Sequence, residues 1–125
     1  RIFKLFRSKR MNQAVTRISD ALWEIRTDLI LFGCIVLILL YFAAVGIYLF
    51  EHDVQPEKFS SIPAAMWWAV ATLTTVGYGD IFPITTGGKI FTAIITILGI
   101  GIIAIPTSLV TTALSKIKND KNTKD

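Results

Sequence analysis

Residues 59–80 read FSSIPAAMWWAVATLTTVGYGD, and this stretch decides the fold. It has no charged residue from Phe59 to Gly79, and longer uncharged runs flank it at 29–50 and 90–114. The flanking runs contain 22 and 25 residues, and a membrane-spanning helix needs about 20. Only 18% of the 125 residues are charged, against roughly 25% in soluble domains. We therefore predict two membrane helices with a third apolar segment between them.

Basic residues gather at the two ends of the chain, whose net charge is +4. Seven of the 13 precede the first apolar run and four follow the second. Because basic residues beside membrane segments stay in the cytoplasm, both termini should be cytoplasmic in a multi-pass protein of the cell membrane. The middle segment must then enter and leave the membrane on the same side.

The middle segment carries the signals of a short helix. Ser60 or Ser61 can cap its start, and Pro63 fits the first turn. A helix over residues 62–74 would be about 20 Å long, which is less than the hydrocarbon core of about 30 Å. We therefore expect the order helix, half-helix, extended return loop, helix.

The return loop can present backbone oxygens to an ion. Gly77 and Gly79 permit positive φ at alternate positions, and this alternation can turn successive carbonyl groups to one side. Several copies around an axis would form stacked rings of oxygen, which can replace the hydration shell of a monovalent cation.

Thr74 to Asp80 resembles the selectivity filter of potassium channels, with the TVGYG signature intact. Similarity to voltage-gated potassium channel pores extends over about residues 8–118, with WWAV at 67–70, IFP at 81–83 and GK at 88–89. The resemblance implies a homotetramer in the lipid bilayer, with four filters around one pore. K⁺ would be the permeant ion, and no organic cofactor is implied.

The resemblance also assigns roles to residues. Gly79 would give the backbone flexibility at the outer mouth. Trp67 would pair with Asp80, and Trp68 with Tyr78, as lateral support. The K⁺-binding carbonyl groups would belong to Thr75, Val76, Gly77 and Tyr78.

The second apolar run contains candidate gating residues. Gly99 occupies the place of a gating hinge in inner helices, although close packing would also explain a glycine there. Pro106 resembles the start of a Pro-x-Pro motif, of which Ser108 replaces the second proline, and we expect it to share the hinge role. Residues at helical spacing are expected to line the water-filled cavity: Thr74, Ile100, Ile103, Thr107 and Thr111.

The N-terminal residues resemble parts of a voltage-gated channel outside the pore. Residues 1–10 repeat a basic residue at every third position, as at the end of a voltage-sensor helix or in a basic juxtamembrane segment. Residues 11–27 have an apolar stripe typical of an amphipathic cytoplasmic linker helix. The remainder of the sensor would be a segment of the same chain that is missing from these residues.

The predicted fold is thus an all-α membrane protein with two transmembrane helices and a re-entrant pore helix. The pore domain covers residues 28–115. Its predicted parts, with the tail that follows, are the outer helix 28–51, turret 52–60, pore helix 61–74, filter 75–80, inner helix 87–115 and cytoplasmic tail 116–125.

We interpret the chain as the pore of a voltage-gated potassium channel of prokaryotic type. One alternative is the pore of a cyclic-nucleotide-regulated potassium channel, to which residues 54–59 are also similar. A second alternative, from another class, is a non-conducting membrane scaffold. An enzyme is not expected, because the single histidine and single cysteine form no nucleophile–base pair and no metal cluster. Membrane flanks explain the basic ends better than nucleic acid binding does.

Overall fold

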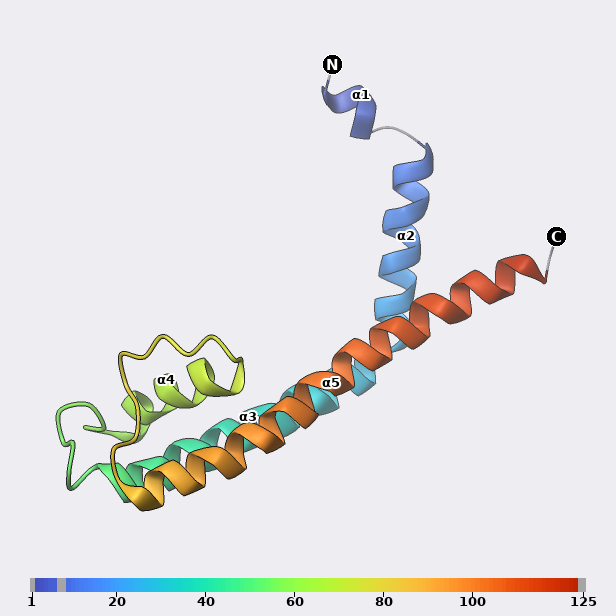
Figure 1. The fold of residues 1–125 in the computed structure, drawn as a ribbon. Coiled ribbons are helices and arrows are strands. Elements are labelled where there is room, and N and C mark those ends of the chain that lie inside the picture. Colours follow the sequence, from blue (N-terminus) through green and yellow to red (C-terminus); the bar gives the residue numbers. More distant parts are fainter. Residues whose placement is uncertain (1, 7–8, 124–125) are drawn as a thin grey trace. The chain divides into compact units, whose positions relative to one another are not determined.

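The computed structural model describes residues 2–6 and 9–123, and within these every regular element is a helix (Figure 1). This confirms the predicted all-helical class. Arg1 and Arg7 of the basic repeat, and residues 124–125 of the tail, lie outside the described residues. The helices are α1 (Ile2–Phe6), α2 (Lys9–Glu24), α3 (Arg26–Glu51), α4 (Ile62–Leu73) and α5 (Thr86–Asn122).

Two of these helices, α3 and α5, are long and apolar enough to cross a membrane. α3 begins two residues before the predicted outer helix. α5 continues through Pro106 and ends at Asn122, whereas the sequence predicted an end at 115. Residues 116–122 contain no glycine or proline to stop the helix. The charged residues from Lys116 onward mark the end of the apolar part of α5, but they do not end the helix itself.

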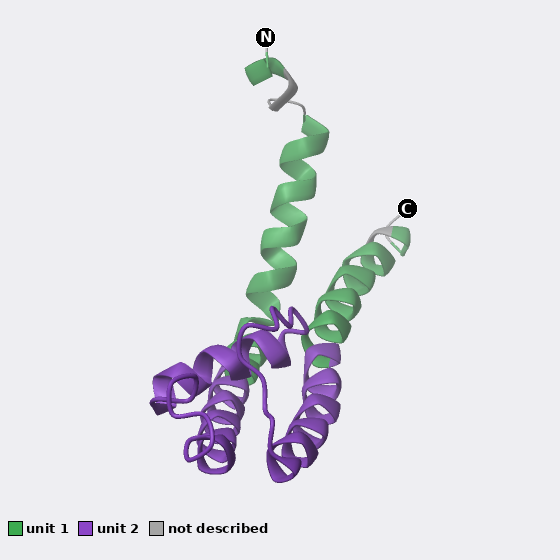
Figure 2. Ribbon diagram, turned by 60° about the vertical axis from the view of Figure 1, so that its left-hand side comes forward, with its two compact units in different colours: residues 1–32, 105–125 green, residues 33–104 purple. Residues whose placement is uncertain are grey.

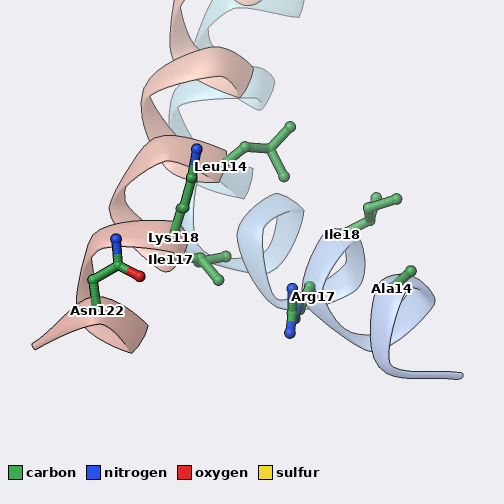
Figure 3. Close-up of a pocket in the computed structure, with 7 residues that line it drawn as sticks. All are labelled: Ala14, Arg17, Ile18, Leu114, Ile117, Lys118 and Asn122. Carbon is green, nitrogen blue, oxygen red and sulfur yellow. The ribbon is translucent and has the colours of Figure 1, made fainter. Parts of the chain in front are cut away.

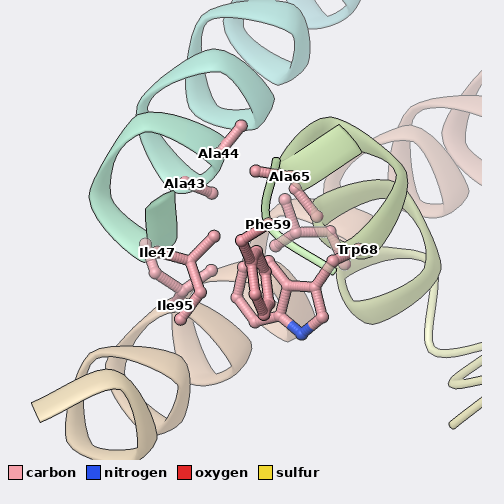
Figure 4. Close-up of a cluster of buried hydrophobic side chains, with 9 residues drawn as sticks. Ala43, Ala44, Ile47, Phe59, Ala65, Trp68 and Ile95 are labelled. Carbon is pink, nitrogen blue, oxygen red and sulfur yellow. The ribbon is translucent and has the colours of Figure 1, made fainter. Parts of the chain in front are cut away.

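The chain divides into two compact units, residues 33–104 and residues 1–32 with 105–125 (Figure 2). In the first unit, small side chains let the helices approach closely, and Figure 4 shows buried side chains converging from α3, α4 and α5. Phe59 meets Trp68 edge to face, with ring centroids 6.4 Å apart. The core consists of Ala43, Ala44, Ile47, Phe59, Ala65, Trp68, Ala69, Leu73 and Ile95.

The N-terminus of α4 is fixed by one serine. Ser61 has an extended backbone, with φ −156° and ψ 166°, and its Oγ accepts a hydrogen bond from the N–H of Ala64 at 3.3 Å. Pro63 lies in the first turn, where its missing N–H leaves no helical bond unmade. The cap is therefore Ser61, the second of the two serines that the sequence offered.

In the other unit, α2 packs on the C-terminal part of α5. Ala21, Ile25 and Ala113 are buried there, and four partly buried apolar residues surround them. Lys116 Nζ lies 2.7 Å from Glu24 Oε1. Because both of these side chains are largely exposed to solvent, the ion pair contributes at most about 1 kcal/mol, and apolar burial holds this unit together.

Candidate functional site

The return loop, residues 75–80, is bonded to the C-terminus of α4. The Thr74 N–H donates to the Val70 carbonyl at 3.0 Å, and the Thr74 hydroxyl donates to the same oxygen at 2.7 Å. The Gly77 N–H donates to the Ala71 carbonyl at 2.9 Å. These bonds satisfy carbonyl groups that a helix end leaves without partners, and they hold the loop against α4.

The backbone of the return loop alternates in sign of φ. Thr75, Gly77 and Gly79 have φ of 62°, 56° and 76°, and the residues between them do not have positive φ. The sequence predicted this alternation from the two glycines. Thr75 extends it by one residue, although a left-handed conformation costs a non-glycine residue about 1–3 kcal/mol. Such a conformation persists only where surrounding contacts impose it.

Every residue from Thr74 to Asp80 is exposed in a single chain. Val76 is 54% exposed and Tyr78 is 64% exposed. An exposed loop of this kind is unfavourable in a single chain. Water does not suit its apolar side chains, and lipid does not satisfy the hydrogen-bonding groups of its irregular backbone. The loop is therefore a surface that further copies of the chain could cover.

Trp67 contacts the return loop at two points. Its Nε1 donates to Asp80 Oδ2 at 2.9 Å, which is the pairing that the resemblance implied. Its ring stacks on that of Tyr78, with centroids 5.4 Å apart and planes 8° from parallel. We call these three residues the outer-mouth cluster. The hydrogen bond from Trp67 holds the pKa of Asp80 below its ordinary value, with smaller contributions from backbone N–H groups and the positive charge of Lys58.

The expected pairing of Trp68 with Tyr78 is not formed within the described residues of one chain. Trp68 is 3% exposed and lies in the core beside Phe59. Consecutive residues point about 100° apart on an α-helix. Within one chain, Trp67 is the tryptophan that contacts the return loop.

Glu51 is a structural residue that the sequence reasoning missed. It is fully buried at the end of α3, and its carboxylate accepts four hydrogen bonds. Oε2 accepts from Gln55 Nε2 at 2.8 Å and from the Ile84 N–H at 3.0 Å. Oε1 accepts from the N–H and the hydroxyl of Thr85, at 3.0 and 2.5 Å. One carboxylate thus ties the end of α3 to the residues that lead into α5.

Gly88 makes room for this carboxylate, because a Cβ atom there would overlap Glu51 Oε1. In the sequence, Glu51 appears only as one of several acidic residues between the spans. A glutamate directly after an apolar run, with glutamine four residues later, was the available signal.

Gly99 faces α4. A Cβ at Gly99 would lie 2.6 Å from Leu73 Cδ2, so the glycine lets α5 pack against this side chain. The contact with Leu73 supports close packing as the reason for a glycine at position 99. Of the predicted cavity residues in the same unit, Thr74 and Ile100 are exposed, and Ile103 is 42% exposed. Thr107 and Thr111 belong to the other unit and are exposed there.

Taken together, these features define a class of helical protein in which a short apolar helix and an irregular loop lie between two helices long and apolar enough to cross a membrane. Residues 34–116, more than half of the chain, match the family described as Ion channel, and the chain belongs to that family.

Three relatives illustrate the similarity. A cyclic nucleotide-gated potassium channel of Rhizobium etli is 52% identical over 68 residues, which cover 54% of this chain and 19% of the relative. A putative potassium channel protein of Rhodopseudomonas palustris is 40% identical over 89 residues, which cover 71% of this chain and 21% of that relative. The mouse potassium voltage-gated channel subfamily A member 5 is 48% identical over 80 residues, which cover 58% of this chain and 13% of that relative. The chain thus spans about a fifth or less of the length of these relatives.

Proposed function

We propose that four copies of this chain form a K⁺-selective pore for passive transport across the cell membrane. The observation that carries the proposal is the alternation of positive φ at Thr75, Gly77 and Gly79 in a loop bonded to the end of α4. The relatives named as potassium channels support the choice of ion.

In this proposal K⁺ exchanges its water shell for backbone oxygens. The carbonyl groups of Thr75, Val76, Gly77 and Tyr78 bind the ion, and the Thr75 hydroxyl adds a ligand at the cavity end. Neutral carbonyl oxygens coordinate a monovalent cation strongly enough for entry and weakly enough for release. Gly79 keeps the outer end of the loop adaptable.

Two electrostatic features favour a cation along this path. The C-terminus of α4 precedes the return loop directly, and a helix C-terminus carries roughly half a negative charge. At the other end, the lowered pKa of Asp80 keeps its carboxylate ionised, so it concentrates cations outside the filter. Trp67 fixes the position of this carboxylate.

Gating would use the inner helix. Gly99 and Pro106 are the proposed hinge residues, and the sequence register puts the cavity lining at Thr74 and Ile100, then at Ile103, Thr107 and Thr111. α2 would act as the linker to a voltage sensor elsewhere in the same protein, with both termini in the cytoplasm. The second candidate function is the pore of a potassium channel regulated by a cyclic nucleotide, which the sequence identity to the Rhizobium etli channel favours.

Ion flux from liposomes tests the proposal. Reconstituted protein should release K⁺ but not Na⁺, and Ba²⁺ should block the release. Gly77→Ala should abolish the flux, because φ +56° strains any L side chain and no neighbouring atom would otherwise contact the new methyl group.

Gly33→Ala is the matched control. A Cβ atom added at this helical glycine would also have no atom within 4 Å, but the position needs no positive φ. Equal release of Na⁺ and K⁺ would overturn the filter assignment. If the assembled protein released neither K⁺ nor Na⁺ in every preparation, the non-conducting scaffold would be favoured.

A further inference from the structure

The predicted turret, residues 52–60, is attached to the segment that follows the return loop. Gln55 Nε2 donates to the Phe82 carbonyl at 3.1 Å. The Lys58 N–H donates in turn to the Gln55 carbonyl at 3.2 Å. These contacts belong to the unit of residues 33–104, and no residue of the groove that α2 and α5 line in the other unit takes part in them (Figure 3). The hydrogen bonds fix the backbone of Lys58 beside Phe82.

The side chain of Lys58 lies over the ring of Phe82. Its Nζ is 4.9 Å from the ring centroid, within the roughly 6 Å over which an aromatic face attracts a cation. Both side chains are exposed. Among the residues that the structure describes, Lys58 takes no part in an ion pair. The ammonium group is therefore held by an uncharged ring, and contact with a carboxylate does not neutralise its charge.

The charge of Lys58 acts on the outer-mouth cluster. It favours the ionised form of Asp80, and so contributes to the lowered pKa of that carboxyl group, although less than the hydrogen bond from Trp67 does. Lys89, the other lysine between the two long apolar runs, makes no such contribution. Lys58 is thus the lysine placed to offset part of the negative charge at the outer end of the return loop.

A positive charge beside Asp80 opposes the role that the proposed function gives to this carboxylate. Asp80 would concentrate cations outside the filter, whereas an ammonium group repels them. In a fourfold assembly each chain would contribute one Lys58, so four such charges would surround the entrance. Attraction and repulsion between exposed charges depend on salt, because the Debye length falls from about 30 Å at 0.01 M to about 3 Å at 1 M. An effect of Lys58 should therefore appear at low ionic strength and vanish at high ionic strength.

We propose that Lys58, held in place by Phe82, limits the entry of external K⁺ into the filter by offsetting the charge of Asp80. This inference rests on the proposed function. Lys58 does not contact the ion, and it acts through the electric field at the entrance. The competing explanation is a structural role, in which the aliphatic stem of Lys58 covers the ring of Phe82 and its charge has no effect on conduction.

Single-channel recording of the assembled protein in phosphatidylcholine bilayers tests the proposal, with K⁺ at about 10 mM or about 1 M on both sides. Lys58→Met keeps an unbranched side chain over Phe82 but removes the charge. It should raise the inward conductance about threefold at the lower concentration and by less than about 1.2-fold at the higher one. The outward conductance should change less, because those ions enter from the other side. Lys58→Arg keeps the charge and should conduct like the unmodified protein.

Lys89→Met is the matched control. Lys89 is also exposed, lies in the first turn of α5 and makes no contribution to the lowered pKa of Asp80. Its substitution removes the same charge and should leave the inward conductance unchanged in both solutions. An increase equal to that of Lys58→Met would show a general effect of surface charge and would overturn the assignment to Lys58.

The NMR signal of the Asp80 carboxyl carbon gives a readout that does not require conduction. Lys58→Met should raise the pKa of Asp80, by less than Trp67→Phe does, and Lys89→Met should not change it. An unchanged pKa in Lys58→Met would contradict the inference even if that variant did not conduct.

The conduction measurements separate this inference from the proposed function. If the unmodified protein conducts K⁺ and Lys58→Met leaves its inward conductance unchanged at low salt, only the inference is overturned, and the structural role of Lys58 is favoured. If the unmodified protein does not conduct K⁺, the proposed function is overturned and the inference with it.

Discussion

Replacing Glu51 by glutamine tests the largest buried polar contact of the unit 33–104. The substitution keeps the shape of the side chain but turns one acceptor oxygen into an NH₂ donor. Each carboxylate oxygen now faces one flexible donor and one backbone N–H, those of Ile84 and Thr85. The flexible partners, Gln55 and the Thr85 hydroxyl, can turn to present an acceptor. A backbone N–H cannot turn in this way.

Whichever way the new amide is oriented, one backbone N–H is therefore left without its acceptor. An unsatisfied buried donor costs about 1–3 kcal/mol, and the remaining hydrogen bonds lose the strengthening that an ionised acceptor provides. We expect Glu51→Gln to lower the free energy of unfolding by roughly 3 kcal/mol.

The measurement is equilibrium unfolding in mixed micelles, followed by tryptophan fluorescence as the denaturing detergent increases. Glu57→Gln is the matched control, because Glu57 is exposed, and surface substitutions usually change stability by no more than about 0.5 kcal/mol. If Glu51→Gln unfolded at the same point as Glu57→Gln, the four hydrogen bonds would not stabilise the protein as described.

Three further predictions concern the other contacts of this unit. Gly99→Ala should destabilise the protein by about 1–3 kcal/mol through overpacking. In a Leu73→Ala background the added methyl group should cost much less, because the side chain that it would meet is shortened. Equal costs in the two unfolding measurements would favour a purely conformational role for the glycine. Asp80 has a lowered pKa, so the stabilisation that its ionised form provides is present above the ordinary value of 3.8 and is lost as the pH falls through the lowered pKa. Its carboxyl carbon signal in NMR should therefore not change between about pH 8 and about pH 5, and Trp67→Phe should move the titration up toward 3.8; an unmoved midpoint would contradict the hydrogen-bond cause. Ser61→Ala should cost about 1 kcal/mol in unfolding experiments, because the N-cap of α4 is lost, and Ser61→Asp should restore most of it.

Much of the fold could be predicted from the sequence. Uncharged runs of sufficient length indicated the two long apolar helices, and a third uncharged run indicated the short apolar helix between them. A capping serine and a following proline gave the start of α4 to within one residue. Each of these features can be recognised within one continuous stretch of sequence, without knowledge of contacts between distant residues.

The parts that could not be predicted depend on contacts that are distant in sequence. Glu51 finds its partners 33 and 34 residues away, so its carboxylate looked like an ordinary surface charge. The partner of each tryptophan ring within one chain depends on the rotational phase of α4, which its nearly uniform apolar sequence does not reveal. Thr75 is β-branched, and its left-handed backbone follows from hydrogen bonds on either side of it rather than from its own preference.

The outer-mouth cluster has a consequence for channels assembled from unlike subunits. Trp67, Tyr78 and Asp80 make their contacts inside one chain. In a fourfold assembly each strand of the filter would then carry its own support. In an assembly of unlike subunits, a copy that lacks the cluster would lose the support of its own filter strand and would leave the supporting contacts of its neighbours in place.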